Sequence, residues 1–145
     1  MYLTFAEYTG YGGTLDETAF NQYEFKARKQ IDSLTAMRVA SLATISEAVK
    51  RCMYELVKQE QIYDDNIQTL ITVTNDSTAS VGKLIASFTT DGYQETYANG
   101  GNADPGTYVM SIRKALDDAE KQIIRDYLAY ERDDSGTLLL YRGVW

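Results

Sequence analysis

Apolar residues recur every three or four positions along three long segments of this chain, and this spacing constrains its fold more than any other feature. In residues 17–34 the apolar positions are Phe20, Tyr23, Ala27, Ile31 and Leu34. The segment after residue 44 repeats the pattern with Ile45, Val49, Cys52 and Leu56. Residues 107–131 repeat it with Val109, Ile112, Leu116, Ala119, Ile123, Tyr127 and Tyr130. Such spacing places apolar side chains on one face of a helix, so the sequence predicts a mainly α-helical fold, a small helical bundle.

These three faces also predict which residues form the core. The chain has a single proline, Pro105, so little interrupts its helices. We expect the core to contain Phe20, Ile31, Ile45, Val49, Cys52, Leu56, Leu116 and Ile123.

Signals for helix starts precede the apolar stripes. The segments at 4–7 and 44–47 both have the spacing of a capping box, with Thr4 and Thr44 as the capping residues. Asp16 is placed to cap the helix at 17–34, and Asp104 precedes Pro105 at the start of the last helix.

Two short β-prone segments, 84–90 and 93–97, depart from the helical pattern. The dipeptide between them, Asp91-Gly92, is typical of a two-residue hairpin turn because both residues tolerate positive φ. Residues 70–74 also have strand-like composition, although the alternative is that residues 68–70 still extend the preceding helix. We therefore expect a β-hairpin or extended loop insertion at about 84–97, with interface residues Asp91, Gly92, Tyr93 and Tyr97.

The amino-acid composition argues against most kinds of chemical function for this chain of 145 residues. It has no histidine, the commonest general base and metal ligand, and its one cysteine, Cys52, cannot form an intrachain disulfide. Asp117 and Asp118 are adjacent on a predicted helix and point about 100° apart, so they do not share a site. We expect no catalytic, cofactor-binding or metal-binding residues, and we predict that the chain is not an enzyme.

The charge of the chain also limits its partners. The formal net charge is −7, and no run of four basic residues occurs. Such a chain repels phosphate groups, so we do not expect it to bind nucleic acid. No apolar run reaches the roughly 18 residues of a membrane span. The 12 tyrosines suit either protein contacts or an aromatic core.

The last nine residues, 137–145, are unusually apolar for a chain end. They either close onto their own core or dock onto another subunit. We expect docking, which divides the chain into a helical domain at 1–136 and a docking tail at 137–145. The interface residues of this tail would be Leu138, Leu139, Leu140, Tyr141, Arg142, Val144 and Trp145.

Seven segments in order carry a family pattern. They read YLTFAEY at 2–8, GG at 12–13, DE at 16–17, ARKQID at 27–32, AVKRCMYEL at 48–56, IASFTTDGYQETY at 85–97 and LLLYRGV at 138–144. Their order and spacing span most of the chain, and together they resemble the head–tail connector proteins (adaptor, or head-completion, proteins) of tailed bacteriophages. Residues 62–81 depart from the pattern, because that stretch is longer than in the family.

The resemblance implies a structural subunit of the phage neck, made in the cytoplasm of the bacterial host and then part of the virion. It implies a homo-oligomeric ring, usually of about twelve subunits, beneath the portal protein. The ring would extend the DNA channel, let the genome pass without specific binding, and receive the next head-closure or tail protein. The alternative interpretation is a cytoplasmic helical regulator or scaffold that binds one protein partner.

Overall fold

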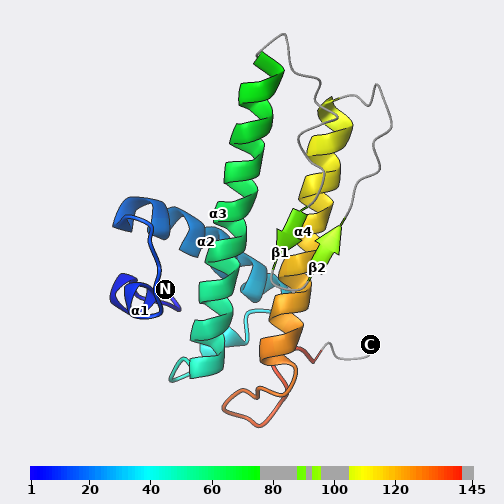
Figure 1. Cartoon of the computed structure of the whole chain (residues 1–145). Coiled ribbons are helices and arrows are strands. Elements are labelled where there is room, and N and C mark those ends of the chain that lie inside the picture. The colour runs from blue at the N-terminus through cyan, green and yellow to red at the C-terminus, as the bar shows by residue number, and fades with distance from the viewer. Residues whose placement is uncertain (76–87, 91–92, 96–104, 142–145) are drawn as a thin grey trace. The chain divides into compact units, whose positions relative to one another are not determined.

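The computed structural model describes residues 1–75, 88–90, 93–95 and 105–141, and side chains at 1–68 and 109–141. Within these residues the fold is mainly α-helical, as predicted (Figure 1). The elements in order are α1 (Phe5–Gly10), α2 (Glu17–Leu34), the 3-10 helix η1 (Val39–Ser41), α3 (Glu47–Asn75), β1 (Phe88–Thr90), β2 (Tyr93–Glu95) and α4 (Pro105–Leu128).

The chain divides into two compact units. Unit 1 consists of Met1–Gln61 and Asp117–Trp145, and unit 2 consists of Ile62–Leu116. Unit 1 therefore contains α1, α2, η1, the first half of α3 and the last half of α4. Both ends of the sequence contribute to it.

The first two helices begin at the predicted caps. The Thr4 hydroxyl accepts the Glu7 amide at 3.3 Å, and the Glu7 carboxylate accepts the Thr4 amide at 2.9 Å, which confirms the capping box. Asp16 Oδ1 accepts the Ala19 amide at 2.9 Å and starts α2. Helix α2 then ends at Leu34, as its apolar stripe predicted.

The core of unit 1 lies where α2, α3, α4 and the C-terminal segment meet. Five predicted core residues are fully buried in it: Phe20, Ile31, Val49, Cys52 and Leu56. Ile45 and Ile123 are partly buried against the same cluster. Leu116 is buried in unit 2 and is not part of this cluster, so its assignment to one common core is wrong.

Aromatic rings fix α1 to this core. The ring centroid of Tyr8 lies 4.8 Å from that of Phe20 and 5.7 Å from that of Tyr54. A Cβ atom at Gly13 would lie 2.2 Å from the Cε1 and Cζ atoms of the buried Tyr8 ring. Gly12 has a φ of +94°, so the pair of glycines allows the chain to turn closely around this ring.

Helix α3 differs from the prediction at both ends. It begins at Glu47, and the hydroxyl of Ser46 accepts the Val49 amide at 3.3 Å. The cap is therefore Ser46, and the predicted cap at Thr44 is wrong. The helix continues to Asn75, so the strand-like segment at 70–74 is helical. β-Branched residues lose only a few tenths of a kcal/mol in a helix, which a continuing hydrogen-bond ladder offsets.

The buried face of α4 also differs from the prediction. The buried apolar residues of α4 are Ile112, Ala115, Leu116, Ile124 and Leu128. The helix ends at Leu128, so Tyr130 lies beyond it and is 91% exposed. The expectation that Tyr130 shares the apolar face is wrong because the helix stops before reaching it.

Strands β1 and β2 pair in antiparallel register, with Thr90 opposite Tyr93. This register places the residues of the predicted turn, Asp91 and Gly92, between the strands. Those two residues and Tyr97 lie outside the described residues, and Tyr93 is described only by its backbone. Their role at an interface stays a prediction.

Candidate functional site

The residues after α4 form a closed turn on the surface of unit 1. Asp133 Oδ1 accepts the amides of Ser135 and Thr137, each at 2.9 Å. A hydrogen bond from the Ser135 hydroxyl makes the largest contribution to holding the pKa of Asp133 below its usual range, and the bonds from these two amides add to it. Arg132 and Leu138 then pair as an antiparallel bridge across the turn.

Arg38 holds the next residues in place. Its Nη1 atom donates to the carbonyl oxygens of Leu138 at 3.3 Å and Leu139 at 3.4 Å, and also to that of Tyr141. Its guanidinium carbon lies 5.8 Å from the centroid of the Tyr141 ring. One side chain therefore binds three backbone groups of the C-terminal segment.

A strained turn brings Arg38 to this position. Ala36 and Met37, directly after α2, have φ values of 50° and 63°. Positive φ costs a residue other than glycine on the order of 1–3 kcal/mol and persists where the surrounding structure holds it. The Met37 amide donates to the Asp32 carbonyl at 2.8 Å, which stabilises this turn.

The segment carries Leu139 into the core of its own chain. Leu139 is fully buried, and its amide donates to the Glu131 carbonyl at 2.8 Å. The prediction that Leu139 docks onto another subunit is therefore wrong, because its backbone is bonded on both sides within unit 1. Leu138 and Leu140 are partly buried, whereas Tyr141 is 50% exposed. Arg142, Val144 and Trp145 lie outside the described residues, and their docking stays a prediction.

Large apolar side chains also remain exposed elsewhere on unit 1. Tyr130 is 91% exposed at the end of α4, Met37 is 58% exposed beside Arg38, and Phe25 is 50% exposed on α2. Aromatic residues are enriched at protein interfaces relative to the rest of a protein surface. These residues, with Tyr141, form the candidate interaction surface. Phe25 was not among the predicted interface residues, although its position off the apolar stripe of α2 was a usable signal.

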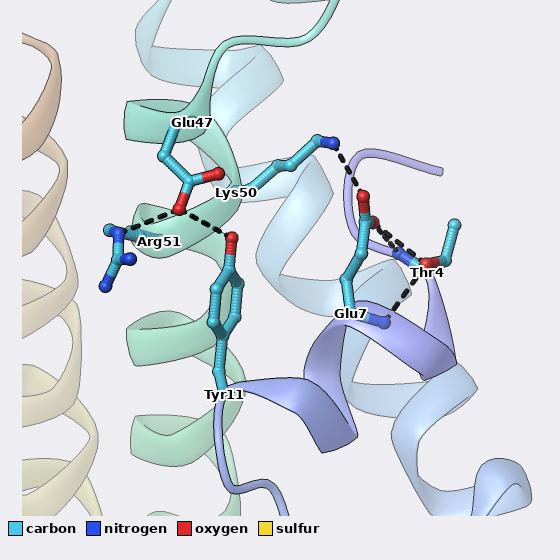
Figure 2. A network of polar contacts seen from close by, with 6 residues as sticks. All are labelled: Thr4, Glu7, Tyr11, Glu47, Lys50 and Arg51. Atoms are coloured by element: carbon cyan, nitrogen blue, oxygen red, sulfur yellow. Dashed lines mark hydrogen bonds and ion pairs between the residues drawn. The ribbon is translucent and has the colours of Figure 1, made fainter.

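Figure 2 shows a polar network between α1 and α3, formed by Thr4, Glu7, Tyr11, Glu47, Lys50 and Arg51. Lys50 Nζ lies 2.6 Å from Glu7 Oε1, and this contact, with the Thr4 amide, lowers the pKa of Glu7 to about 2. Glu47 Oε1 accepts the Tyr11 hydroxyl and lies 2.9 Å from Arg51 Nε. The charges are paired with one another, so this network stabilises the helix contact.

Cys52 is a free cysteine buried in the core of unit 1. Burial raises the pKa of Cys52 to about 12, so this thiol stays protonated. Among the described residues, no group of three or more His, Cys, Asp or Glu side chains could hold a metal ion. None of the helices that the structure describes is long and apolar enough to cross a bilayer.

Comparisons with known proteins add no relative. The chain matches no protein-family model, no curated protein and no solved structure. The resemblance to connector proteins therefore rests on the seven sequence segments.

Proposed function

We propose that this chain is a structural subunit of a phage neck. In this proposal, copies of the chain form a ring beneath the portal, extend the DNA channel and join the head to the tail. One observation carries the proposal: a closed helical unit leaves Tyr130 91% exposed to water. A tyrosine offers a large, rigid contact area at low cost in conformational entropy, which suits an interface between subunits.

The fold supports the proposal through the segments that resemble connector proteins. Thr4 and Glu7 cap α1, Gly13 allows the ring of Tyr8 to pack, and Val49 and Leu56 lie in the core. Several of the seven segments thus contain residues that build the body of unit 1. This distribution is what a shared fold with divergent surfaces would produce.

The proposed ring assigns a role to each surface. We assign the portal contact to Tyr141 and the residues that follow it, Arg142, Val144 and Trp145. The hairpin at 84–97 would contact a neighbouring subunit or the channel. With a net charge of −7, a channel wall made of this chain would repel DNA and let the genome slide through.

The mass of the purified chain in solution tests the proposal. Twelve copies of a 16.3 kDa chain would weigh about 196 kDa, which light scattering after size exclusion separates from a monomer. We expect a ring with a central channel in negative-stain images, either alone or with portal-containing heads. A one-to-one complex with some other protein would support the regulator or scaffold instead. A chain that stays monomeric in the presence of such heads would refute the proposal.

A further inference from the structure

The outer face of α2 carries an aromatic ring between two cations, an arrangement that the core does not require. The Phe25 ring centroid lies 5.4 Å from Arg28 Cζ and 5.2 Å from Lys29 Nζ. The buried residues of α2 are Phe20, Glu24, Ala27 and Ile31. At 100° per residue, Phe25 and Lys29 lie together on the face opposite to these buried residues. We call Phe25, Arg28 and Lys29 the Phe25 patch.

The two cations of the Phe25 patch differ in their contacts with carboxylates. Arg28 Nε lies 3.5 Å from Glu24 Oε2. Lys29 forms no ion pair among the described residues. The nearby carboxylates are engaged by Tyr2, whose amide donates to Glu24 at 3.0 Å and whose hydroxyl donates to Asp32. In a chain with a net charge of −7, Lys29 thus presents a positive charge next to an exposed ring.

The end of α4 carries the complementary arrangement. Tyr130 is 91% exposed and lies four residues after Asp126, just beyond the end of α4. Asp126 Oδ1 accepts the Gln122 side-chain amide at 2.7 Å, and Asp126 forms no ion pair within the part of the chain described. With Tyr127, which is 37% exposed, these residues form the Tyr130 patch.

The two patches lie on different elements of unit 1, the Phe25 patch on α2 and the Tyr130 patch at the end of α4 and just beyond it. In Figure 1, α2 crosses behind the first half of α3, and the end of α4 lies at the bottom of the view. A single copy can therefore present one patch to each of two neighbours.

We infer that the Phe25 patch of one copy binds the Tyr130 patch of the next copy. Lys29 would lie opposite Asp126, and the Tyr130 ring would pack against Phe25 and its flanking cations. Aromatic pairs and cation–π contacts favour this arrangement, and the opposite charges set its register. A contact between two different patches is heterologous, and its repetition forms a ring when the rotation from one copy to the next closes. The inference rests on the proposed function, because it names the contact that holds the proposed ring together.

Charge reversal tests this contact directly. Lys29→Glu and Asp126→Lys each place like charges opposite one another. Each should raise the dissociation constant for self-association about tenfold or more, as measured by sedimentation velocity. The double variant restores opposite charges and should return the constant close to that of the wild type. Tyr130→Ser should weaken association without any change in charge.

Lys58→Glu is the matched control. Lys58 is an exposed lysine on α3 whose Nζ atom lies 3.8 Å from Glu55 Oε2. Its substitution changes the net charge by the same amount as Lys29→Glu. We expect it to leave self-association unchanged. The milder variants Lys29→Gln and Asp126→Asn should act in the same direction as the reversals if either reversal disturbs folding. Far-UV circular dichroism checks the fold of every variant.

The outcomes separate this inference from the proposed function. If the wild-type chain assembles and the single reversals do not weaken assembly, the contact between the two patches is refuted. The proposed ring would then be held together by other surfaces. A double variant no stronger than the single variants also refutes the contact. A wild-type chain that stays monomeric, alone and with portal-containing heads, refutes both.

Discussion

Replacing Leu139 by alanine tests whether the C-terminal segment belongs to the fold of its own subunit. The Leu139 side chain is fully buried in the cluster that contains Leu56, Ile124 and Leu128. Its truncation leaves a cavity in that cluster, which costs about 2–5 kcal/mol of unfolding free energy. At roughly 2–4 °C per kcal/mol for a chain of this size, the melting temperature should fall by about 4–20 °C.

Urea denaturation followed by far-UV circular dichroism measures this free energy, and a thermal melt gives the second value. Tyr141→Ala is the control, because this residue is 50% exposed and its ring contacts the Arg38 guanidinium at 5.8 Å. An exposed cation–π contact contributes about 0.5–1 kcal/mol, so Tyr141→Ala should cost no more than that. If Leu139→Ala melts like the wild type and only impairs assembly, Leu139 is a docking residue and its place in the core is refuted.

Three further substitutions test the local structure. Gly13→Ala places a methyl group 2.2 Å from the Tyr8 ring. It should therefore lower the unfolding free energy by about 1–3 kcal/mol in urea titrations. An unchanged urea midpoint would contradict the close packing of Gly13 against Tyr8. Ser46→Ala should cost about 1 kcal/mol in the same assay, whereas Thr44→Ala should cost far less; the reverse order would restore the cap predicted at Thr44. The pKa of Glu7 is about 2, below its ordinary 4.5, so its contribution is present above pH 4.5 and lost as the pH falls towards 2. Glu7→Gln should therefore flatten the loss of stability between pH 4.5 and 2, and an unchanged slope would show that Glu7 is not responsible.

Helix α2 shows what a local sequence pattern can predict. Its cap at Asp16 and its apolar stripe lie within one continuous segment, and both predicted bounds are those of the structure. Both signals act between residues a few positions apart, so the sequence carries them without any knowledge of tertiary contacts. The capping box at Thr4 and Glu7 was predictable for the same reason.

The cap of α3 and the C-terminal segment depend on residues distant in sequence. Ser46, besides capping α3, donates its hydroxyl to Glu131 Oε2 at 2.8 Å, 85 residues away. That tertiary contact favours Ser46 over Thr44 as the cap of α3. It cannot be predicted from the spacing of residues near the helix start. Leu139 is held by Arg38, 101 residues earlier, from a turn with two positive φ values. An apolar run at a chain end was therefore compatible with docking and with burial.

The candidate interaction surface was only partly predictable. Tyr141 was predicted as an interface residue and is exposed, whereas Tyr130 was expected on the apolar face of the last helix. The exposure of Tyr130 depends on where α4 ends, and helix ends are the least certain part of a pattern-based prediction. Phe25 was open to prediction, because a large aromatic residue opposite an apolar stripe has no place in the core.

The division of the chain into units has a consequence for its synthesis on the ribosome. Unit 1 joins Met1–Gln61 with Asp117–Trp145, so about 55 residues of unit 2 are made before its second part begins. At 5–20 residues per second, that interval lasts about 3–11 s. During this time the apolar faces of α2 and α3 have been made, but Ile124, Leu128 and Leu139 have not. The nascent chain thus presents an incomplete core for seconds, long enough for a chaperone to bind it before the C-terminal part completes the fold.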